Sequence, residues 1–396
     1  MRVLLSTLGT AGDVIPFARV ARALTARGHA VTVHSWEIWR PWFADTGARF
    51  VAAGGGVSDP ELDAGLEHAL RDPSPWGQIA RFARLFYGLG DGAARAEAAL
   101  ASARAALAGQ DLALVNVLDH VTQAAALESG VPWASYASRP PPDDARTDGP
   151  LADVDRALAE LLARVTGVAR RWRTFRQRSP LRDLASCSPH LLGAPARPAP
   201  TTLLTGSWLA PRQLDAPLPP AVAAFLAAGP AVFVTFGTMP DVTGRTAALV
   251  AAAAESGARA IVQILAAQPV PERVPASVLV VRERLPFDAL LPRVAAVVHH
   301  GSSGTTHEVV RAGRPQVVVP HMGDQYLWAA TVAQRGLGPP PIPFAQATVP
   351  ALAERFAALA DPRWERAAAA LAKHLAAEDG VAAAVAELEA LAGGHP

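Results

Sequence analysis

The sequence predicts an α/β protein made of two domains, each with a parallel sheet covered by helices. The chain has 396 residues, which is long for a single hydrophobic core. Short apolar runs alternate with helical patterns, and this alternation starts again after a proline-rich stretch at 216–230. Hydrophobic residues make up 51% of the chain and charged residues 18%, a balance typical of buried sheets and not of a disordered chain.

The first domain is expected over residues 1–215. Its first strand is followed by a glycine-containing turn and a helix over about 16–27, in which Phe17, Val20, Ala21 and Leu24 share one face. Gly28 is placed to end that helix. A second helix is expected around 121–127. The strands of this domain are predicted at 3–6, 30–34, 49–53, 112–117 and 131–137.

Two segments of this domain, 54–91 and 139–200, lack the alternation. They contain proline-rich turns and arginine-rich helical pieces. Insertions of this size on an α/β scaffold either shape a binding site or form variable surface. We favour a binding site for a second substrate. The pair Asp153 and Asp155 imitates a DxD metal motif, but the surrounding helical pattern favours a solvated helix face.

The stretch 216–230 contains four prolines and is predicted to link the domains. The second domain is expected over 231–372, and the remainder, 373–396, is expected to be a helix that returns to the first domain. The strands of the second domain are predicted at 231–236, 259–265, 278–281, 295–299 and 316–320.

Charge and cysteine content exclude several classes of function. The formal net charge of +1 gives no bulk attraction to nucleic acid or to an acidic membrane. Cys187 is the single cysteine, so an intrachain disulfide and a thiolate cluster are excluded, and a reducing cytoplasmic location is expected. The apolar start of the chain is interrupted by Gly9, Gly12 and Asp13, which argues against a signal peptide. No run approaches the roughly 18 apolar residues of a membrane span. The oligomeric state stays open, and a homodimer is compatible with the sequence.

The strongest chemical signal is VVHHGSSGTTH at 297–307. An apolar strand ends in two histidines, a loop of small residues follows, and a helix is predicted to begin near Gly304 to Thr306. Such a loop directs backbone N–H groups and a helix dipole at an anion, so the segment predicts a diphosphate site. The alternative is a tight turn with the histidines satisfied in the core.

A second signal follows the next strand, at HMGDQ over 321–325. Doubly wound sheets bind ligands at the carboxyl ends of their strands. The adjacent carboxylate of Asp324 and carboxamide of Gln325 can share several hydroxyl groups, which suits a sugar. The alternative is that the pair simply caps the following helix.

These two motifs resemble a known family. The run LPFDALLPRVAAVVHHGSSGTTHEVVRAGRPQVVVPHMGDQYLWA at 285–329 resembles the donor-binding signature of the UDP-glycosyltransferase superfamily, particularly its bacterial antibiotic and macrolide glycosyltransferases. The opening STLGTAGDVIP at 6–16 resembles the same family's acceptor-side motif. The resemblance implies the GT-B fold, with two Rossmann-like domains facing across a cleft, and covers most of the chain except about 55–200.

The resemblance also implies roles for particular residues. His299 takes the place of the histidine that contacts the phosphates, Asp324 and Gln325 match the pair that holds the sugar, and Arg284 and Leu285 lie in the segment that packs on the nucleobase. Arg284 stands where an aromatic residue is frequent, and its guanidinium plane can stack in its place. The other implied donor-binding residues are Thr10, Gly12, Gly237, Thr238, Gly301, Ser302, Ser303, Gly304 and Thr305.

Two departures from the family pattern carry expectations. His307 stands where users of UDP-sugars often have a ribose-binding Glu, which favours a dTDP-sugar, although Glu308 is adjacent. Asp13 stands where many members have His, and some bacterial relatives also have Asp there. Asp13 is therefore the expected catalytic base, with a helix cap as the alternative. Asp119 and His120 are weaker candidates for an orienting partner or substitute base.

The implied function is an inverting, metal-independent glycosyltransferase with a nucleotide-sugar co-substrate, no other cofactor and a small apolar natural-product acceptor. A nucleotide-sugar epimerase or hydrolase of the same fold is one alternative, and a non-catalytic partner of another glycosyltransferase is a second. The loop from Gly9 to Gly12 imitates part of a dinucleotide fingerprint, but it lacks the G-x-G-x-x-G spacing that an NAD enzyme would have.

Overall fold

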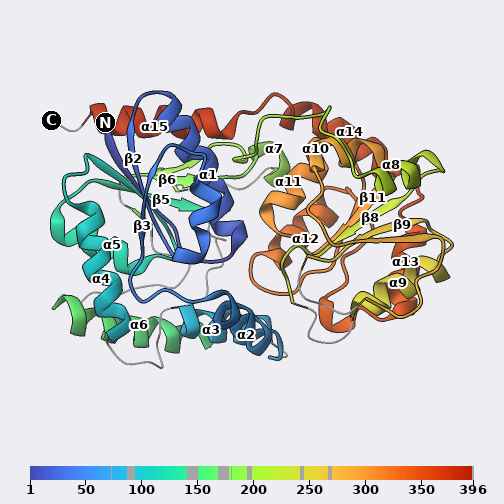
Figure 1. The fold of residues 1–396 in the computed structure, drawn as a ribbon, viewed down its shortest axis with the longest axis horizontal. Helices are drawn as coiled ribbons and strands as arrows, with labels where there is room; N and C mark the ends of the chain where they lie inside the picture. Colours follow the sequence, from blue (N-terminus) through green and yellow to red (C-terminus); the bar gives the residue numbers. More distant parts are fainter. Residues whose placement is uncertain are drawn as a thin grey trace.

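The chain forms two α/β units whose sheets are both parallel, as the sequence predicts (Figure 1). The computed structural model describes residues 1–72, 74–86, 94–140, 150–167, 178–179, 181–193, 199–240, 245–265 and 270–394. Within these ranges, no helix combines the length and the apolar character that a membrane crossing requires.

Seven strands of the described ranges form the first sheet, in the order β3-β2-β1-β4-β5-β6-β7. The chain winds outward in both directions from the point between β1 and β4, so the loops after these two strands open onto the same place. The last two strands at one edge, β6 and β7, were not predicted, because each has only three residues and they lie within or just after the segment that lacks a clear pattern. The strands are β1 (Arg2–Ser6), β2 (Ala30–Ser35), β3 (Arg49–Ala52), β4 (Leu112–Asn116), β5 (Trp133–Ala137), β6 (Asp183–Ala185) and β7 (Thr202–Leu204).

The first helix, α1 (Ala11–Ala26), begins five residues before the predicted start at Pro16. The earlier start arises because Thr10 is the N-cap and the carboxylate of Asp13 accepts the Thr10 backbone N–H at 2.9 Å. The predicted apolar face is confirmed, since all four of its residues are buried. The other helices of this unit are η1 (Glu37–Phe43), α2 (Asp59–Leu70), α3 (Pro75–Phe86), α4 (Ala94–Leu107), α5 (His120–Ser129), α6 (Pro150–Thr166) and α7 (Pro189–Leu192).

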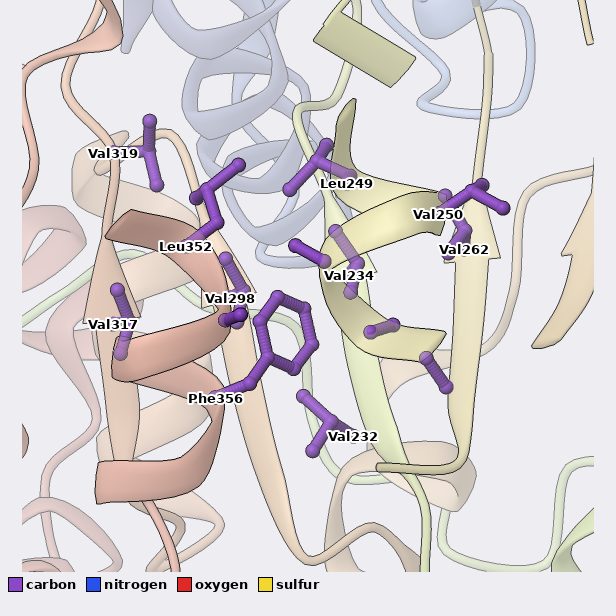
Figure 2. Close-up of a cluster of buried hydrophobic side chains, with 14 of the residues drawn as sticks. Val232, Val234, Leu249, Val250, Val262, Val298, Val317, Val319, Leu352 and Phe356 are labelled. Carbon is purple, nitrogen blue, oxygen red and sulfur yellow. The ribbon is translucent and has the colours of Figure 1, made fainter. Parts of the chain in front are cut away.

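The second sheet has the strand order β10-β9-β8-β11-β12, with its own switch point between β8 and β11. Valines from its strands pack against Leu352 and Phe356, which lie on α13, and against residues of α9 (Figure 2). The strands are β8 (Val232–Thr235), β9 (Ala260–Gln263), β10 (Val278–Val281), β11 (Ala296–His299) and β12 (Gln316–Val318).

The helices of the second unit cover both faces of this sheet. A short helix, α8, lies within the stretch that was predicted to be a linker, where consecutive alanines favour a helix after the prolines. The helices are α8 (Pro220–Ala227), α9 (Arg245–Glu255), α10 (Phe287–Leu290), η2 (Leu291–Arg293), α11 (Ser303–Arg311), α12 (Gln325–Gln334), η3 (Phe344–Gln346), α13 (Val349–Ala358) and α14 (Pro362–Leu375). One further helix, α15 (Gly380–Gly393), follows them in the chain.

The last helix lies on the first domain, beside α1 (Figure 1). Its residues Val385 and Leu388 are buried in the same apolar cluster as Phe17 and Trp208. Glu389 adds two ion pairs to the first domain, with Arg27 at 2.8 Å and with His29 at 2.7 Å. The chain thus ends by tying the two domains together.

The ion pairs of Glu389 should make the stability of the protein depend on pH. Hydrogen bonds from Arg27 and His29 lower the pKa of Glu389 to about 2, from an ordinary value of 4.5. The unfolded chain therefore binds this proton more readily, and the stabilisation present above about pH 4.5 is lost as pH falls toward 2. We expect wild type to have a higher melting temperature than Glu389→Gln at pH 6, and the difference to shrink at pH 3.

The matched control is Glu354→Gln, which removes an exposed ion pair with Arg355 at 2.6 Å on α13. Exposed pairs of this kind contribute little to stability. A melting-temperature difference for Glu389→Gln that stays constant from pH 6 to pH 3 would contradict the linkage.

Candidate active site

The carboxyl ends of the two sheets meet where the domains touch. Ser138 follows β5 in the first sheet, and its hydroxyl donates a hydrogen bond of 3.1 Å to Oδ2 of Asp324, which follows β12 in the second sheet. Met322, from the same loop as Asp324, packs against an apolar cluster of the first domain. The carboxyl ends of both sheets therefore contribute to one interdomain site.

Asp13 lies in the first turn of α1 and is held by the loop after β1. Its Oδ2 accepts hydrogen bonds from the backbone N–H of Thr10 at 2.9 Å and from the Thr10 hydroxyl at 3.0 Å. The hydroxyl of Thr7 donates to the Asp13 carbonyl at 3.0 Å, and the Asn116 amide donates to the Thr7 hydroxyl at 3.2 Å. Gly9 makes the arrangement feasible: its φ is +128°, and a Cβ there would lie 2.4 Å from the Asp13 carboxylate.

The environment of Asp13 makes it a better base than an ordinary aspartate. Burial raises the pKa of Asp13 to about 6, and the negative charge of Asp324 across the domain boundary adds to the rise. Hydrogen bonds from Thr10 and Asn116 oppose it. The side chain still keeps part of its surface exposed. Asp13 therefore combines the helix-capping role and an accessible carboxylate of raised basicity.

Asp119 does not fit the predicted role of a substitute base. It is the N-cap of α5, where Oδ1 accepts the Thr122 N–H at 3.0 Å, and Oδ2 accepts the Ser6 hydroxyl at 2.6 Å. The Ser6 hydroxyl also lies 2.9 Å from Nδ1 of His34. Asp119 is only 1% exposed, so both its oxygens serve a buried network beneath the loop. Its neighbour His120 is also buried, with Nδ1 3.3 Å from the Leu118 carbonyl.

His299 is a core histidine and not the predicted phosphate contact. Its Nδ1 accepts the Gly301 backbone N–H at 3.0 Å, so its Nε2 carries the proton and donates to Oε1 of Gln316 at 2.7 Å. The side chain is fully buried, and burial lowers its pKa to about 4. With both ring nitrogens bonded inside the domain, His299 has no donor left for a diphosphate.

His300, the next residue, faces the switch point of the second sheet. Its ring lies against Gly237, where a Cβ would be 3.2 Å from Cε1. Its Nδ1 is buried and has no hydrogen-bond partner within the described ranges. Burial lowers the pKa of His300 well below its usual value, and the nearby His321 contributes. The unsatisfied Nδ1 of His300 is therefore the histidine atom that can form a hydrogen bond with a ligand.

The loop after β11 has the geometry of an anion site. Helix α11 begins at Ser303, one residue before the predicted start near Gly304 to Thr306. Ser302 is its N-cap, and the Ser302 hydroxyl oxygen lies 3.4 Å from the Thr305 N–H. Gly301 has a φ of +91°, and a Cβ there would lie 2.6 Å from Val318. Gly304 has open space around it, and the hydroxyl of Ser303 lies 3.5 Å from the Ser138 carbonyl of the other domain.

Asp324 and Gln325 lie at the start of α12 but have different environments. Asp324 occupies the N-cap position without making a side-chain cap, and its carboxylate instead meets Ser138. Oε1 of Gln325 accepts the backbone N–H of His321 at 2.8 Å and that of Met322 at 3.2 Å. Only the amide nitrogen of Gln325 can therefore offer hydrogen bonds to a sugar without breaking the loop.

Comparison with known proteins agrees with this two-domain fold. Residues 247–391 match the family model "Erythromycin biosynthesis protein CIII-like, C-terminal domain". The chain is 31% identical to O-mycaminosyltylonolide 6-deoxyallosyltransferase of Streptomyces fradiae, covering 96% of this chain and 95% of that protein. The chain belongs to the UDP-glycosyltransferase superfamily, among its natural-product glycosyltransferases.

This glycosyltransferase has further relatives of known name and structure. It is 30% identical to a sterol 3-beta-glucosyltransferase of Arabidopsis thaliana, covering 97% of this chain and 67% of that protein. Its fold is similar to that of the glycosyltransferase VinC in complex with dTDP, with a TM-score of 0.66, 21% identity, and coverage of 99% of this chain and 100% of that chain. The GT-B architecture predicted for the glycosyltransferase is therefore confirmed.

His307 of the glycosyltransferase joins the two domains and does not line a ribose site. Its Nδ1 donates to the Ser303 carbonyl at 2.7 Å, so its Nε2 accepts the Ser188 backbone N–H of the first domain at 3.1 Å. The ring is fully buried against Trp328. The argument that His307 favours a dTDP-sugar loses its basis, because the side chain is committed to the domain contact. Glu308 is paired with Arg311 at 2.6 Å.

The nucleobase segment of the glycosyltransferase also contacts the first domain. Leu285 is buried, whereas Arg284 is exposed and its guanidinium carbon lies 5.0 Å from the ring centroid of Trp42. Gly237 and Thr238 form the turn after β8, with Thr238 exposed. The backbone N–H and the hydroxyl of Thr10 both donate hydrogen bonds to Asp13. Thr10, which was predicted to bind the donor, therefore positions the candidate base instead.

An apolar cluster of the glycosyltransferase includes residues of the loops after β1 and β4. It contains Leu8 from the loop after β1 and Leu118 from the loop after β4, and helices α2, α3 and α6 close over it. The predicted DxD pair lies on α6, where Asp153 is exposed and bonded to Arg156 at 3.2 Å. Sequence reasoning missed Asn116 and Ser138, although polar residues at strand ends were the available signal.

Proposed function

We propose that this glycosyltransferase moves a hexose or deoxyhexose from a dTDP-sugar or UDP-sugar to a hydroxyl group of a small apolar natural product, with inversion. One observation carries the proposal: Asp13, a carboxylate of raised basicity on one domain, interacts electrostatically with Asp324 of the other domain, which the Ser138 hydroxyl bonds across the domain boundary. A base and a leaving-group site on opposite domains suit a single displacement.

In the proposed reaction, the acceptor oxygen forms a bond to the anomeric carbon as the bond from that carbon to the diphosphate oxygen breaks. The acceptor proton passes to Asp13, and the electron pair of the broken bond leaves with the diphosphate. Backbone N–H groups at the start of α11 would stabilise that charge, and so would the ring of His300 once the bound anion raises its pKa and Nδ1 takes up a proton. Because these groups supply the stabilisation, we propose that the reaction needs no metal.

Different observations support the proposed donor nucleotide and the proposed acceptor. The similar structure of VinC holds dTDP, which favours a dTDP-sugar for this chain as well. The relative that is named a sterol 3-beta-glucosyltransferase favours an acceptor with a largely hydrocarbon surface.

Calorimetric titration of the purified protein with dTDP and UDP tests the proposed donor. We expect both nucleotides to bind and dTDP to bind more tightly, with activity that persists in EDTA. Tighter binding of UDP would reverse the preference, and failure of both nucleotides to bind would contradict the proposed donor site. Nuclear magnetic resonance of a glycosylated product then reports whether the anomeric configuration is inverted.

A further inference from the structure

We propose that Arg139 of the first domain completes the donor-sugar subsite and makes it prefer neutral sugars over amino sugars. This inference rests on the proposed function, because it concerns the sugar held at Asp324. It also identifies the class of donor among the many sugars that a natural-product glycosyltransferase could use.

The segment after β5 already touches both parts of the donor site. The Ser138 hydroxyl donates to Asp324 at 3.1 Å, and the Ser303 hydroxyl lies 3.5 Å from the Ser138 carbonyl. Arg139 is the next residue, and its Nε lies 3.4 Å from the Pro140 carbonyl. The guanidinium group of Arg139, on the first domain, is close enough to Asp324 of the second domain for their charges to interact.

Arg139 also lies over Trp328, one helical turn beyond Asp324. The guanidinium carbon is 5.8 Å from the ring centroid of Trp328. Trp328 is fully buried, and its side chain contributes a hydrogen bond that lowers the pKa of Asp324. Arg139 and Asp324 therefore share Trp328 as a neighbour.

The charges of the two side chains influence one another without a direct pair. Burial raises the pKa of Asp324, whereas the positive charge of Arg139 and the Ser138 hydrogen bond oppose the rise. In the part of the chain that the structure describes, no ion pair within 4.0 Å joins Arg139 to Asp324. A ligand group bonded to Asp324 would therefore feel both charges.

A neutral hydroxyl group suits this arrangement, since it can donate to the carboxylate and accept from the guanidinium. An ammonium group could only donate, and its attraction to Asp324 would be offset by repulsion from Arg139, whereas a hydroxyl group gains a hydrogen bond from each of the two side chains. The pair therefore favours a sugar with free hydroxyl groups and disfavours a sugar with an amino group.

The test compares binding of dTDP-glucose with that of a dTDP-4-amino-4,6-dideoxyhexose by calorimetry. We expect wild type to bind the neutral sugar about tenfold more tightly than the amino sugar, from one like-charge contact in a partly desolvated site. Arg139→Met should abolish the preference, and Arg139→Lys should retain it. Binding of dTDP alone should be equal in all three proteins, which verifies that the variants are folded.

A matched control is Arg335→Met, which removes another interdomain arginine, bonded to the His190 carbonyl at 2.6 Å. It should leave the sugar preference unchanged. Unchanged preference in Arg139→Met, or equal binding of both sugars to wild type, would overturn the inference alone. Failure of dTDP and of UDP to bind wild type would overturn the proposed function and the inference with it.

Discussion

Asp13→Asn is expected to lower kcat by roughly 10² to 10⁴-fold, the range typical of a lost general base. An amide cannot take the proton of the acceptor. The substitution should leave the helix start intact, because the amide oxygen of Asn can still accept the Thr10 backbone N–H that Asp13 accepts at 2.9 Å. Steady-state kinetics, dTDP affinity and the melting temperature of the variant separate the two roles of the residue.

The control for this experiment is Asp119→Asn, which alters the buried N-cap of α5 instead of the accessible carboxylate. It should affect stability more than the pH profile of turnover. If Asp13→Asn has the kcat of the wild type, Asp13 is not the base, and His120 becomes the next candidate. A fall in kcat together with a large fall in melting temperature would assign the effect to folding.

The pH profile offers an independent measurement of the same carboxylate. A general base acts in its deprotonated form, and burial raises the pKa of Asp13 to about 6. We therefore expect kcat/KM of the wild type to fall as pH drops below about 6. Because the charge of Asp324 contributes to this rise, Asp324→Asn should move the inflection to lower pH.

The second large effect is expected from His300→Ala, which should weaken dTDP binding about 10- to 150-fold. This corresponds to the loss of about 1.5 to 3 kcal/mol for a hydrogen bond to a charged group. The reason is that Nδ1 of His300 is buried and unsatisfied at the switch point where the diphosphate is proposed to bind. Calorimetry with dTDP measures the effect, and thymidine, which lacks phosphates, should bind variant and wild type alike.

His299→Ala provides the contrast, since the two histidines are adjacent. It leaves the Gly301 N–H and Oε1 of Gln316 without partners in the core, which should cost about 1 to 3 kcal/mol of stability. Its main effect should be on the melting temperature. If His300→Ala binds dTDP as tightly as wild type, the diphosphate must bind elsewhere.

Local patterns were sufficient to predict most of the fold. Strand β10 begins and ends at the predicted residues, and the other long strands differ by two residues or fewer at either end. Apolar runs and their spacing are properties of consecutive residues, so they are visible in the sequence. Strands β6 and β7 were missed because three residues carry too little pattern, and these strands depend on pairing with β5.

For the site too, some features follow from neighbouring residues in the sequence and others only from the tertiary structure. The sequence by itself determined the two parallel-sheet domains, the position of Asp13 at the first turn, and the loop that can bind a diphosphate, since each depends on neighbouring residues. Only the tertiary structure decided that His300 and not His299 faces the switch point, and that Asp324 meets Ser138. Neighbouring residues at a strand end project to opposite sides, and the packing of distant segments selects which side is the core.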